Sequence, residues 1–268
     1  MSYQSAIQAH LGDYARSRLG VYEQGTFRDK AYPHILPNRL KFLNFLEPVR
    51  AELQEYLKQN PGIKLHQFFH HLNSSQAFAF NLFYPYFVNG AQPAKMLSSA
   101  LGVEINEVKW WQFEWIPDVV EGTNIDVAWC ISEDVMVYCE VKLTEAEFGR
   151  ALHDERHIRK LTEIYRPRLF GLVNEELLEE KAFFEHYQLL RNISFLADRK
   201  SHLVLLMPRE NLALQPQLQR VLKSLNPSIA SHVHIAYVED VINQLLYEKT
   251  LTPDLRFYAK LLKEKYVL

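Results

Sequence analysis

Hydrophobic positions recur with a helical period in the first third of the chain. Residues 38–60 place apolar side chains three and four positions apart, which predicts a helix that is kinked near Pro48 and ends before a Pro-Gly pair. Residues 66–87 are apolar on most faces, which predicts a buried helix that ends near Pro85. The N-terminal part of the chain is therefore expected to be helical.

The pattern changes to a period of two in the middle of the chain. Residues 108–116, 124–131 and 135–143 are rich in Val, Ile and Trp and are separated by turn-forming residues. Three adjacent strands are expected. The tryptophans of the first segment are expected in the core: Trp110, Trp111 and Trp115.

A helical period returns after the third strand. Thr144 and Glu147 have the spacing of a capping box, which predicts that a helix begins there and that helices continue to about Leu196. Strands are then expected at 201–208 and 232–238, with helices at 214–225, 239–249 and 254–266. This order predicts an α/β fold with a central mixed β-sheet flanked by helices. We expect a domain over 64–268 that packs with an N-terminal helical extension over 1–63.

Composition adds limits to this picture. The 268 residues are 48% hydrophobic and 23% charged, as in a soluble globular protein, and the net charge of −2 argues against a purely electrostatic nucleic-acid binder. No run approaches the roughly 20 apolar residues of a membrane helix, and the first residues lack the pattern of a signal peptide. Cys130 and Cys139 are too few for a disulfide framework. A cytoplasmic protein without a membrane partner is expected.

The strands predicted at 124–131 and 135–143 carry the most informative polar residues. Because successive side chains of a strand point to opposite faces, Glu140 and Lys142 share one face of the second strand. In the first strand, Asp126 faces away from its apolar neighbours. Two acids and one ammonium group are thus expected on strands that otherwise look buried.

The turn between these strands sets their register. If residues 132–134 form a three-residue loop, Ile131 pairs with Val135, and Asp126 lies opposite Glu140 with Cβ atoms about 5 Å apart. Two opposed carboxylates repel each other and need a cation or a shared proton. Ligation by oxygen atoms alone suits Mg²⁺ or Mn²⁺ better than zinc. Lys142 can then polarise a metal-bound water or stabilise charge on a scissile phosphate.

Other interpretations of these residues stay open. Lys142 can instead form a salt bridge with Asp126 at a sheet edge, which relieves the repulsion without metal. A literal Pro-Asp pair ends at Asp118, whereas Asp126 follows Ile125, although Asp126 has the better facing. Another Glu-x-Lys triplet, residues 179–181, lies in a predicted helix and is interpreted as a solvated face.

The hairpin from Asn124 to Lys142, between predicted helices, resembles the PD-(D/E)XK nuclease superfamily. More narrowly, three pieces look like a group of bacterial restriction-endonuclease-like proteins: NSSQAFAFNLF at 73–83, TNIDVAW with CEVKLTEAEFG, and YQLLRN at 187–192. The resemblance implies that Asp126 and Glu140 bind Mg²⁺ or Mn²⁺ with the carbonyl of Val141 and that Lys142 assists catalysis. It implies hydrolysis of nucleic-acid phosphodiesters, in DNA more than RNA, and leaves a homodimer open. The alternative is a catalytically inactive nucleic-acid or protein interaction module with the same fold.

This chain departs from the superfamily pattern on the first core helix. Many members carry a metal-associated glutamate there, but residues 66–87 contain no acid. Gln76 or Asn81 can substitute, or Glu114 can approach from the first strand. Ser75 can also line the site or bond within its own helix.

Two further groups of residues are candidates for substrate contacts. Gln188 and Arg191 share a helix face, where a helix–sheet contact and a substrate contact are both reasonable. A stripe at helical spacing after the hairpin is a candidate for phosphate contacts on nucleic acid: Arg150, His153, His157 and Lys160.

Overall fold

The computed structural model describes residues 2–268, which form two compact units. Unit 1 comprises residues 2–108, Met207–Glu210 and Ala236–Leu268, and unit 2 comprises Lys109–Leu206 and Asn211–Ile235. Each unit is described by itself. The division expected after residue 63 stays a prediction.

Unit 1 is mainly helical. Its helices are α1 (Tyr3–Ser17), α2 (Arg50–Gln59), α3 (Ser75–Val88), α4 (Ala91–Ala100), α11 (Val238–Tyr247) and α12 (Pro253–Tyr266), and a small hairpin joins β1 (Gly25–Phe27) to β2 (Lys30–Tyr32). Side-chain caps fix two helix starts, since the hydroxyl of Ser2 accepts from Ser5 N and that of Thr252 from Leu255 N. The predicted helices at 239–249 and 254–266 are confirmed.

The helix predicted over 38–60 is wrong in its first half. A 3-10 helix (Asn38–Asn44) and a short turn containing Pro48 precede α2. The buried Asn44 side chain donates to the carbonyl oxygens of Phe69 and His71, and Leu46 N donates to Asn81 Oδ1. These tertiary bonds replace the hydrogen bonds that a continuous helix would make within itself.

The helix predicted over 66–87 is also shorter at its start. Residues near His70 instead form an isolated β-bridge with residues near Ile35, through bonds from Leu36 N to His70 O and from Leu72 N to His34 O. Helix α3 begins only after Ser74, whose hydroxyl accepts from Ala77 N, and it continues through Pro85.

Lys265 lies fully buried in unit 1 without a carboxylate partner among residues 2–268. Its Nζ donates to the carbonyl oxygen of Asn44 at 2.5 Å and to Asn44 Oδ1 at 2.7 Å. Burial, together with the nearby Arg50, holds the pKa of Lys265 well below its ordinary value. The folded chain therefore releases a proton that the unfolded chain keeps.

We expect the free energy of unfolding to rise with pH below the ordinary lysine pKa of 10.5, because the unfolded lysine binds a proton there to a greater extent than the folded one. The contribution of this group is at most about 1.4 kcal/mol per pH unit. Urea unfolding at several pH values should show this slope in the wild type and a smaller slope in Lys265→Met. Lys260→Met, which removes an exposed lysine of the same helix, is the control. Equal slopes in Lys265→Met and the wild type would contradict the prediction.

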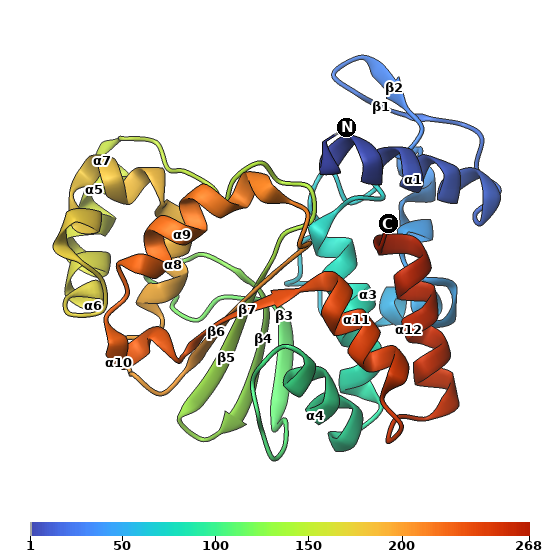
Figure 1. Ribbon diagram of the computed structural model, residues 1–268. Coiled ribbons are helices and arrows are strands. Elements are labelled where there is room, and N and C mark those ends of the chain that lie inside the picture. Colours follow the sequence, from blue (N-terminus) through green and yellow to red (C-terminus); the bar gives the residue numbers. More distant parts are fainter. Residues whose placement is uncertain (1) are drawn as a thin grey trace. The chain divides into compact units, whose positions relative to one another are not determined.

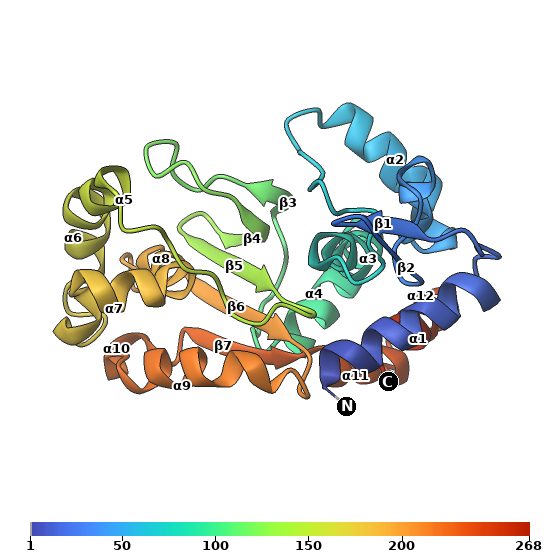
Figure 2. The same ribbon diagram turned by 90° about the horizontal axis from the view of Figure 1, so that it is seen from above.

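Unit 2 contains a five-stranded sheet in the order β3-β4-β5-β6-β7 (Figure 1 and Figure 2). The strands are β3 (Trp110–Trp115), β4 (Ile125–Ser132), β5 (Val135–Val141), β6 (His202–Met207) and β7 (Val233–Tyr237). Strands β3, β4 and β5 are antiparallel, whereas β5 and β6 are parallel, so the sheet is mixed. The predicted α/β fold with a mixed central sheet and a helical N-terminus is confirmed. Among residues 2–268 no helix has the length and apolar character needed to cross a membrane.

The register of the β4–β5 hairpin is confirmed, but its loop differs from the expected one. Val127 pairs with Cys139, and one further step along both strands sets Asp126 opposite Glu140. Ser132, rather than Ile131, pairs with Val135, because the ladder shifts by one residue between Cys130 and Ser132. This bulge absorbs the extra residue near the turn and leaves the remaining pairs unchanged.

The predicted tryptophan core is wrong. Trp110 is 38% exposed, and Trp111 and Trp115 are only partly buried. Trp129 and Phe113 fill the sheet core instead.

The helix predicted from the Thr144 capping box is wrong as well. The helices of unit 2 are α5 (Glu155–Lys160), α6 (Arg166–Leu169), α7 (Glu180–Glu185), α8 (Tyr187–Ser194), α9 (Gln215–Lys223) and α10 (Pro227–Ala230). Leu143 N donates to Glu145 Oε2, and Asn211 Nδ2 donates to the carbonyl oxygens of Leu143 and Glu145. These side chains satisfy main-chain groups that a helix would otherwise satisfy, so the segment forms bends instead of a helix.

Candidate active site

Strands β4 and β5 bring two acidic residues together. Glu140 is buried at 2% exposure and Asp126 is partly buried on the neighbouring strand. Val141 N donates to Asp126 Oδ2 at 2.7 Å, which fixes the carboxylate of Asp126 against the main chain of β5. The expected meeting of Asp126 with Glu140 on one side of the hairpin therefore occurs.

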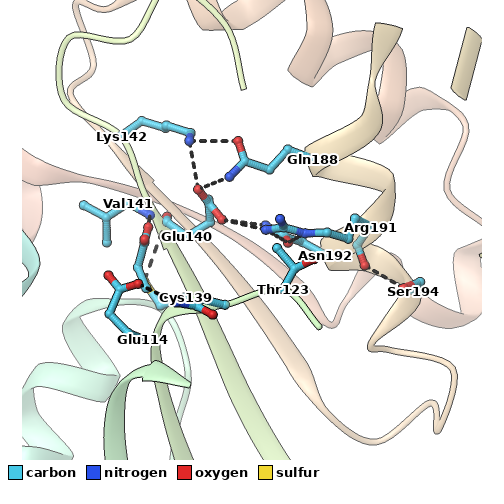
Figure 3. A network of polar contacts seen from close by, with 12 residues as sticks. Glu114, Thr123, Cys139, Glu140, Val141, Lys142, Gln188, Arg191, Asn192 and Ser194 are labelled. Carbon is cyan, nitrogen blue, oxygen red and sulfur yellow. Dashed lines mark hydrogen bonds and ion pairs between the residues drawn. The ribbon is translucent and has the colours of Figure 1, made fainter. Parts of the chain in front are cut away.

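Lys142 completes the expected trio through an ion pair with Glu140. Lys142 Nζ lies 2.8 Å from Glu140 Oε1, and both side chains are buried. Gln188 on α8 closes this arrangement, because Lys142 Nζ donates to its Oε1 at 2.9 Å and its Nε2 donates to Glu140 Oε1 at 2.7 Å (Figure 3). The salt bridge expected as an alternative, between Lys142 and Asp126, is replaced by this pair with Glu140.

Helix α8 also holds the second oxygen of the Glu140 carboxylate. Asn192 Nδ2 donates to Glu140 Oε2 at 2.9 Å, and an Arg191 guanidinium nitrogen lies 3.6 Å from the same oxygen (Figure 3). Arg191 in turn donates twice to Asn192 Oδ1. Gln188 and Arg191 thus both contact the site, as a helix–sheet contact. The sequence reasoning did not identify Asn192, although its position four residues after Gln188 places it on the same helix face.

The three ionisable groups of the site have pKa values that are shifted in different directions. Burial alone would raise the pKa of Glu140, but Lys142 and Arg191 hold this pKa below its ordinary value. Burial alone would lower the pKa of Lys142, but Glu140, Glu145 and Asp126 raise it. Burial and the neighbouring Glu140 and Glu114 raise the pKa of Asp126 well above its ordinary value. The protein thus keeps a Glu140–Lys142 ion pair and leaves Asp126 without a balancing cation of its own.

Glu114 approaches the site from β3. Its backbone has a positive φ of 51°, unusual for a residue other than glycine, and its Oε2 accepts from Asn124 Nδ2 at 3.0 Å. Its charge raises the pKa of Asp126. Glu114 is therefore near enough to act on Asp126 electrostatically.

The Pro-Asp pair that ends at Asp118 lies in a different environment. Asp118 forms an ion pair with Arg168 and accepts hydrogen bonds from Val120 N and Glu121 N. It therefore stabilises the connection between β3 and β4.

The donor set is one that Mg²⁺ or Mn²⁺ prefers. Among residues 2–268 no group of three or more His, Cys, Asp or Glu side chains is arranged to hold a metal ion, so side chains would supply two ligands here. Within the same residues, Asp126 Oδ1 accepts no hydrogen bond, and three close contacts occupy the carboxylate of Glu140 out of about four acceptor directions. Mg²⁺ commonly binds through one or two carboxylates and keeps several waters. The two carboxylates fit such an ion, and ligation by the carbonyl of Val141 stays a prediction.

Three of the expected supporting residues belong to unit 1. Asn81 is saturated there, since its amide donates to Asn44 O and Tyr266 Oη and its Oδ1 accepts from Leu46 N. Gln76 accepts from His66 N and donates to Lys64 O. Ser75 begins helix α3. Their participation in the site stays a prediction.

The basic stripe expected after the hairpin does not form a single helical face, because α5 begins only at Glu155. Each of its members is paired within unit 2: Arg150 with Glu147, His153 with Glu180, His157 with Asp154, and Lys160 with the carbonyl oxygen of Glu121. Contact of these residues with nucleic acid stays a prediction.

Gly149 supports Gln188 and was not identified from the sequence. It has a φ of +114° and its carbonyl oxygen accepts from Gln188 N. A Cβ atom at this position would lie 2.8 Å from Gln188 Oε1. The amide of Gln188 therefore needs a glycine beside it.

We expect Gly149→Ala to lower the activity of the site about tenfold, because it displaces the amide that holds Lys142 and Glu140. Cleavage kinetics would measure this loss. Gly62→Ala is the control, since a Cβ there meets no atom within 4 Å. Equal rates for both variants would show that the position of Gln188 does not matter.

Comparisons with known proteins give one result. The family model described as "Restriction Endonuclease associating with ARP" matches residues 8–267. Neither the comparison with curated proteins nor that with solved structures gave a match.

Proposed function

We propose that this chain, which belongs to the family of restriction endonucleases associating with ARP, is a metal-dependent nuclease of the PD-(D/E)XK type. The family description itself points to a nuclease-like function for the chain. The observation that carries the finer proposal is the meeting of Asp126, Glu140 and Lys142 at the β4–β5 hairpin. This combination of two acids and one ammonium group suits phosphodiester hydrolysis.

Asp126, Glu140 and the carbonyl of Val141 would hold Mg²⁺ or Mn²⁺. When bound, such an ion lowers the pKa of water and offsets charge on the phosphate. The protein's own contribution is to fix the two carboxylates, since Val141 N holds Asp126 and the side chains of Gln188 and Asn192 hold Glu140. Ligating carboxylates are commonly oriented by such outer hydrogen bonds.

Lys142 supplies positive charge beside the reacting phosphate. The ion pair with Glu140 keeps its ammonium group protonated, and Gln188 limits its movement. A buried, oriented ammonium group stabilises negative charge that develops in the transition state, because it needs no reorganisation during the reaction.

The proposed substrate is nucleic acid, DNA more than RNA. Arg150, His153, His157 and Lys160 remain proposed backbone contacts, and a homodimer remains the proposed assembly. Salt dependence of binding would test the first of these and sedimentation the second.

Binding of Mn²⁺ and cleavage of DNA test the proposal together. We expect the wild type to bind Mn²⁺ in calorimetry and to cut plasmid or single-stranded DNA, and Asp126→Asn to lose both, because the amide removes the charged ligand. Asp134→Asn is the matched control, since Asp134 lies exposed in the turn of the same hairpin. Asp118→Asn separates the two candidate aspartates, Asp118 and Asp126, and should retain metal binding.

The outcomes differ for each alternative. Loss of metal binding in Asp118→Asn with retention in Asp126→Asn would move the proposed site to Asp118. A wild type that neither binds Mn²⁺ better than Asp126→Asn nor cleaves any nucleic acid would instead support an inactive interaction module with this fold.

A further inference from the structure

Glu121 is a fully buried acid that the proposed chemistry does not use. It lies in the connection between β3 and β4, five residues before Asp126, with 0% exposure. Its Oε1 accepts from Tyr165 Oη at 2.5 Å and from Thr123 Oγ1 at 2.6 Å, and its Oε2 accepts from Thr123 N at 2.9 Å. Hydroxyl-to-carboxylate bonds of this length are among the stronger ones in proteins. Glu121 thus fixes the main chain that leads into β4.

Tyr165 carries this connection to helix α8. It ends a π-helical turn (Leu161–Tyr165), and its hydroxyl lies 3.0 Å from the hydroxyl of Tyr187. Tyr187 is the first residue of α8, and Gln188 follows it directly. Single π-helical turns are often found at functional sites, where they redirect one side chain. Here the turn places the Tyr165 hydroxyl between Glu121 and Tyr187.

The series of hydrogen bonds from Glu121 through Tyr165 to Tyr187 connects the two halves of the candidate site. One end holds the segment that delivers Asp126, and the other holds the start of the helix whose Gln188 and Asn192 contact Glu140. We propose that Glu121 is a positioning residue that acts through Tyr165 and Tyr187 to keep α8, and with it the Glu140–Lys142 pair, in place relative to Asp126. The proposal rests on the proposed nuclease function.

The identity of Glu121 supports a role in geometry beyond simple anchoring. Burying a carboxylate costs several kcal/mol, and a hydrophobic side chain often stabilises a buried position as well or better. Lys160 offsets part of this cost: its Nζ lies 3.8 Å from Glu121 Oε1 and donates to the carbonyl oxygen of Glu121. The hydrogen bonds of Glu121 fix the orientation of its partners, because a hydrogen bond tolerates a smaller range of distances and angles than an apolar contact does. The second anchor of the connection, the Asp118–Arg168 pair, is more exposed and is therefore expected to be weaker.

Removal of single hydroxyl groups tests the proposal. Tyr165→Phe keeps the ring but breaks both links, whereas Tyr187→Phe breaks only the link to α8 and leaves the Glu121–Tyr165 bond intact. We expect both variants to lower kcat about tenfold or more and to weaken Mn²⁺ binding, with KM for DNA unchanged. Tyr258→Phe is the matched control, since it removes a buried hydroxyl that donates to Asn81 O in unit 1 and should leave kcat unchanged.

Two results would overturn the proposal. If Tyr165→Phe loses stability to the same degree as Tyr258→Phe but keeps kcat and Mn²⁺ affinity, Glu121 only stabilises the fold. If Tyr187→Phe behaves as the wild type while Tyr165→Phe is impaired, Glu121 anchors its own segment without acting on α8. Mn²⁺ affinity is measured without cleavage. A wild type that binds Mn²⁺ but cuts no DNA would contradict the nuclease function. The role of Glu121 would still be decided by the Mn²⁺ affinity of the two tyrosine variants.

Discussion

Substitution of Lys142 by alanine is expected to lower the rate of phosphodiester cleavage by at least about 100-fold, the usual effect of removing one oriented group that stabilises transition-state charge. Lys142 Nζ is held by Glu140 and Gln188, so its position before the reaction is already fixed. A group fixed in this way contributes more than a mobile surface lysine, because no free energy is spent on orienting it. Single-turnover cleavage of plasmid DNA with saturating Mg²⁺ would measure this loss.

Lys200→Ala is the control for this change. Lys200 is an exposed lysine of the same unit that pairs with Asp134, and its removal should leave the rate unchanged. Lys142→Arg tests geometry separately, since the larger guanidinium does not fit between Glu140 and Gln188 as the ammonium group does. A cleavage rate in Lys142→Ala within a few-fold of the wild type would remove Lys142 from the chemistry.

Substitution of Glu140 by alanine is expected to have the largest combined effect. It removes a proposed metal ligand, so cleavage should fall to background. It also leaves the buried Lys142 and Arg191 without their carboxylate partner. Loss of one partner of a buried ion pair costs about 3–5 kcal/mol, so unit 2 should be destabilised by roughly that amount.

Urea unfolding and Mn²⁺ calorimetry would measure the two effects of Glu140→Ala. Glu147→Ala is the matched control, because Glu147 forms an exposed pair with Arg150 and its loss should change stability by less than about 1 kcal/mol. Glu140→Gln keeps the shape of the side chain and should separate loss of charge from loss of packing. Unchanged stability in Glu140→Ala would show that Lys142 and Arg191 find other partners.

The β4–β5 hairpin could be predicted because the residues that determine its pairing are close together in the sequence. Alternating apolar residues set which side chains face together, and the short connection limited the register, so the pairing that places Asp126 opposite Glu140 was correct. The loop residue that opposes Val135 was wrong by one position. A bulge near the turn gave the same register for the rest of the strands.

The segment after β5 shows where local patterns fail. Thr144 and Glu147 match a capping box, but the side chains of Asn211 and Gln217, more than 60 residues away, bond to the main chain of this segment. Local helix signals are worth about 1 kcal/mol, which several tertiary hydrogen bonds together exceed. The same competition shortened the helices predicted over 38–60 and 66–87.

The sequence by itself determined the mixed α/β class and the acidic and basic residues of the hairpin, because strand period and short-range pairing depend on neighbours along the chain. Only the tertiary structure decided that Lys142 pairs with Glu140 rather than Asp126 and that Gln188 and Asn192 of α8 orient this pair. It also decided the burial of Glu121 against the hydroxyl of Tyr165. The contacts of Gln188, Asn192 and Tyr165 join residues 44 to 52 positions apart. The free energy that selects them comes from burial and from satisfying polar groups in the folded core.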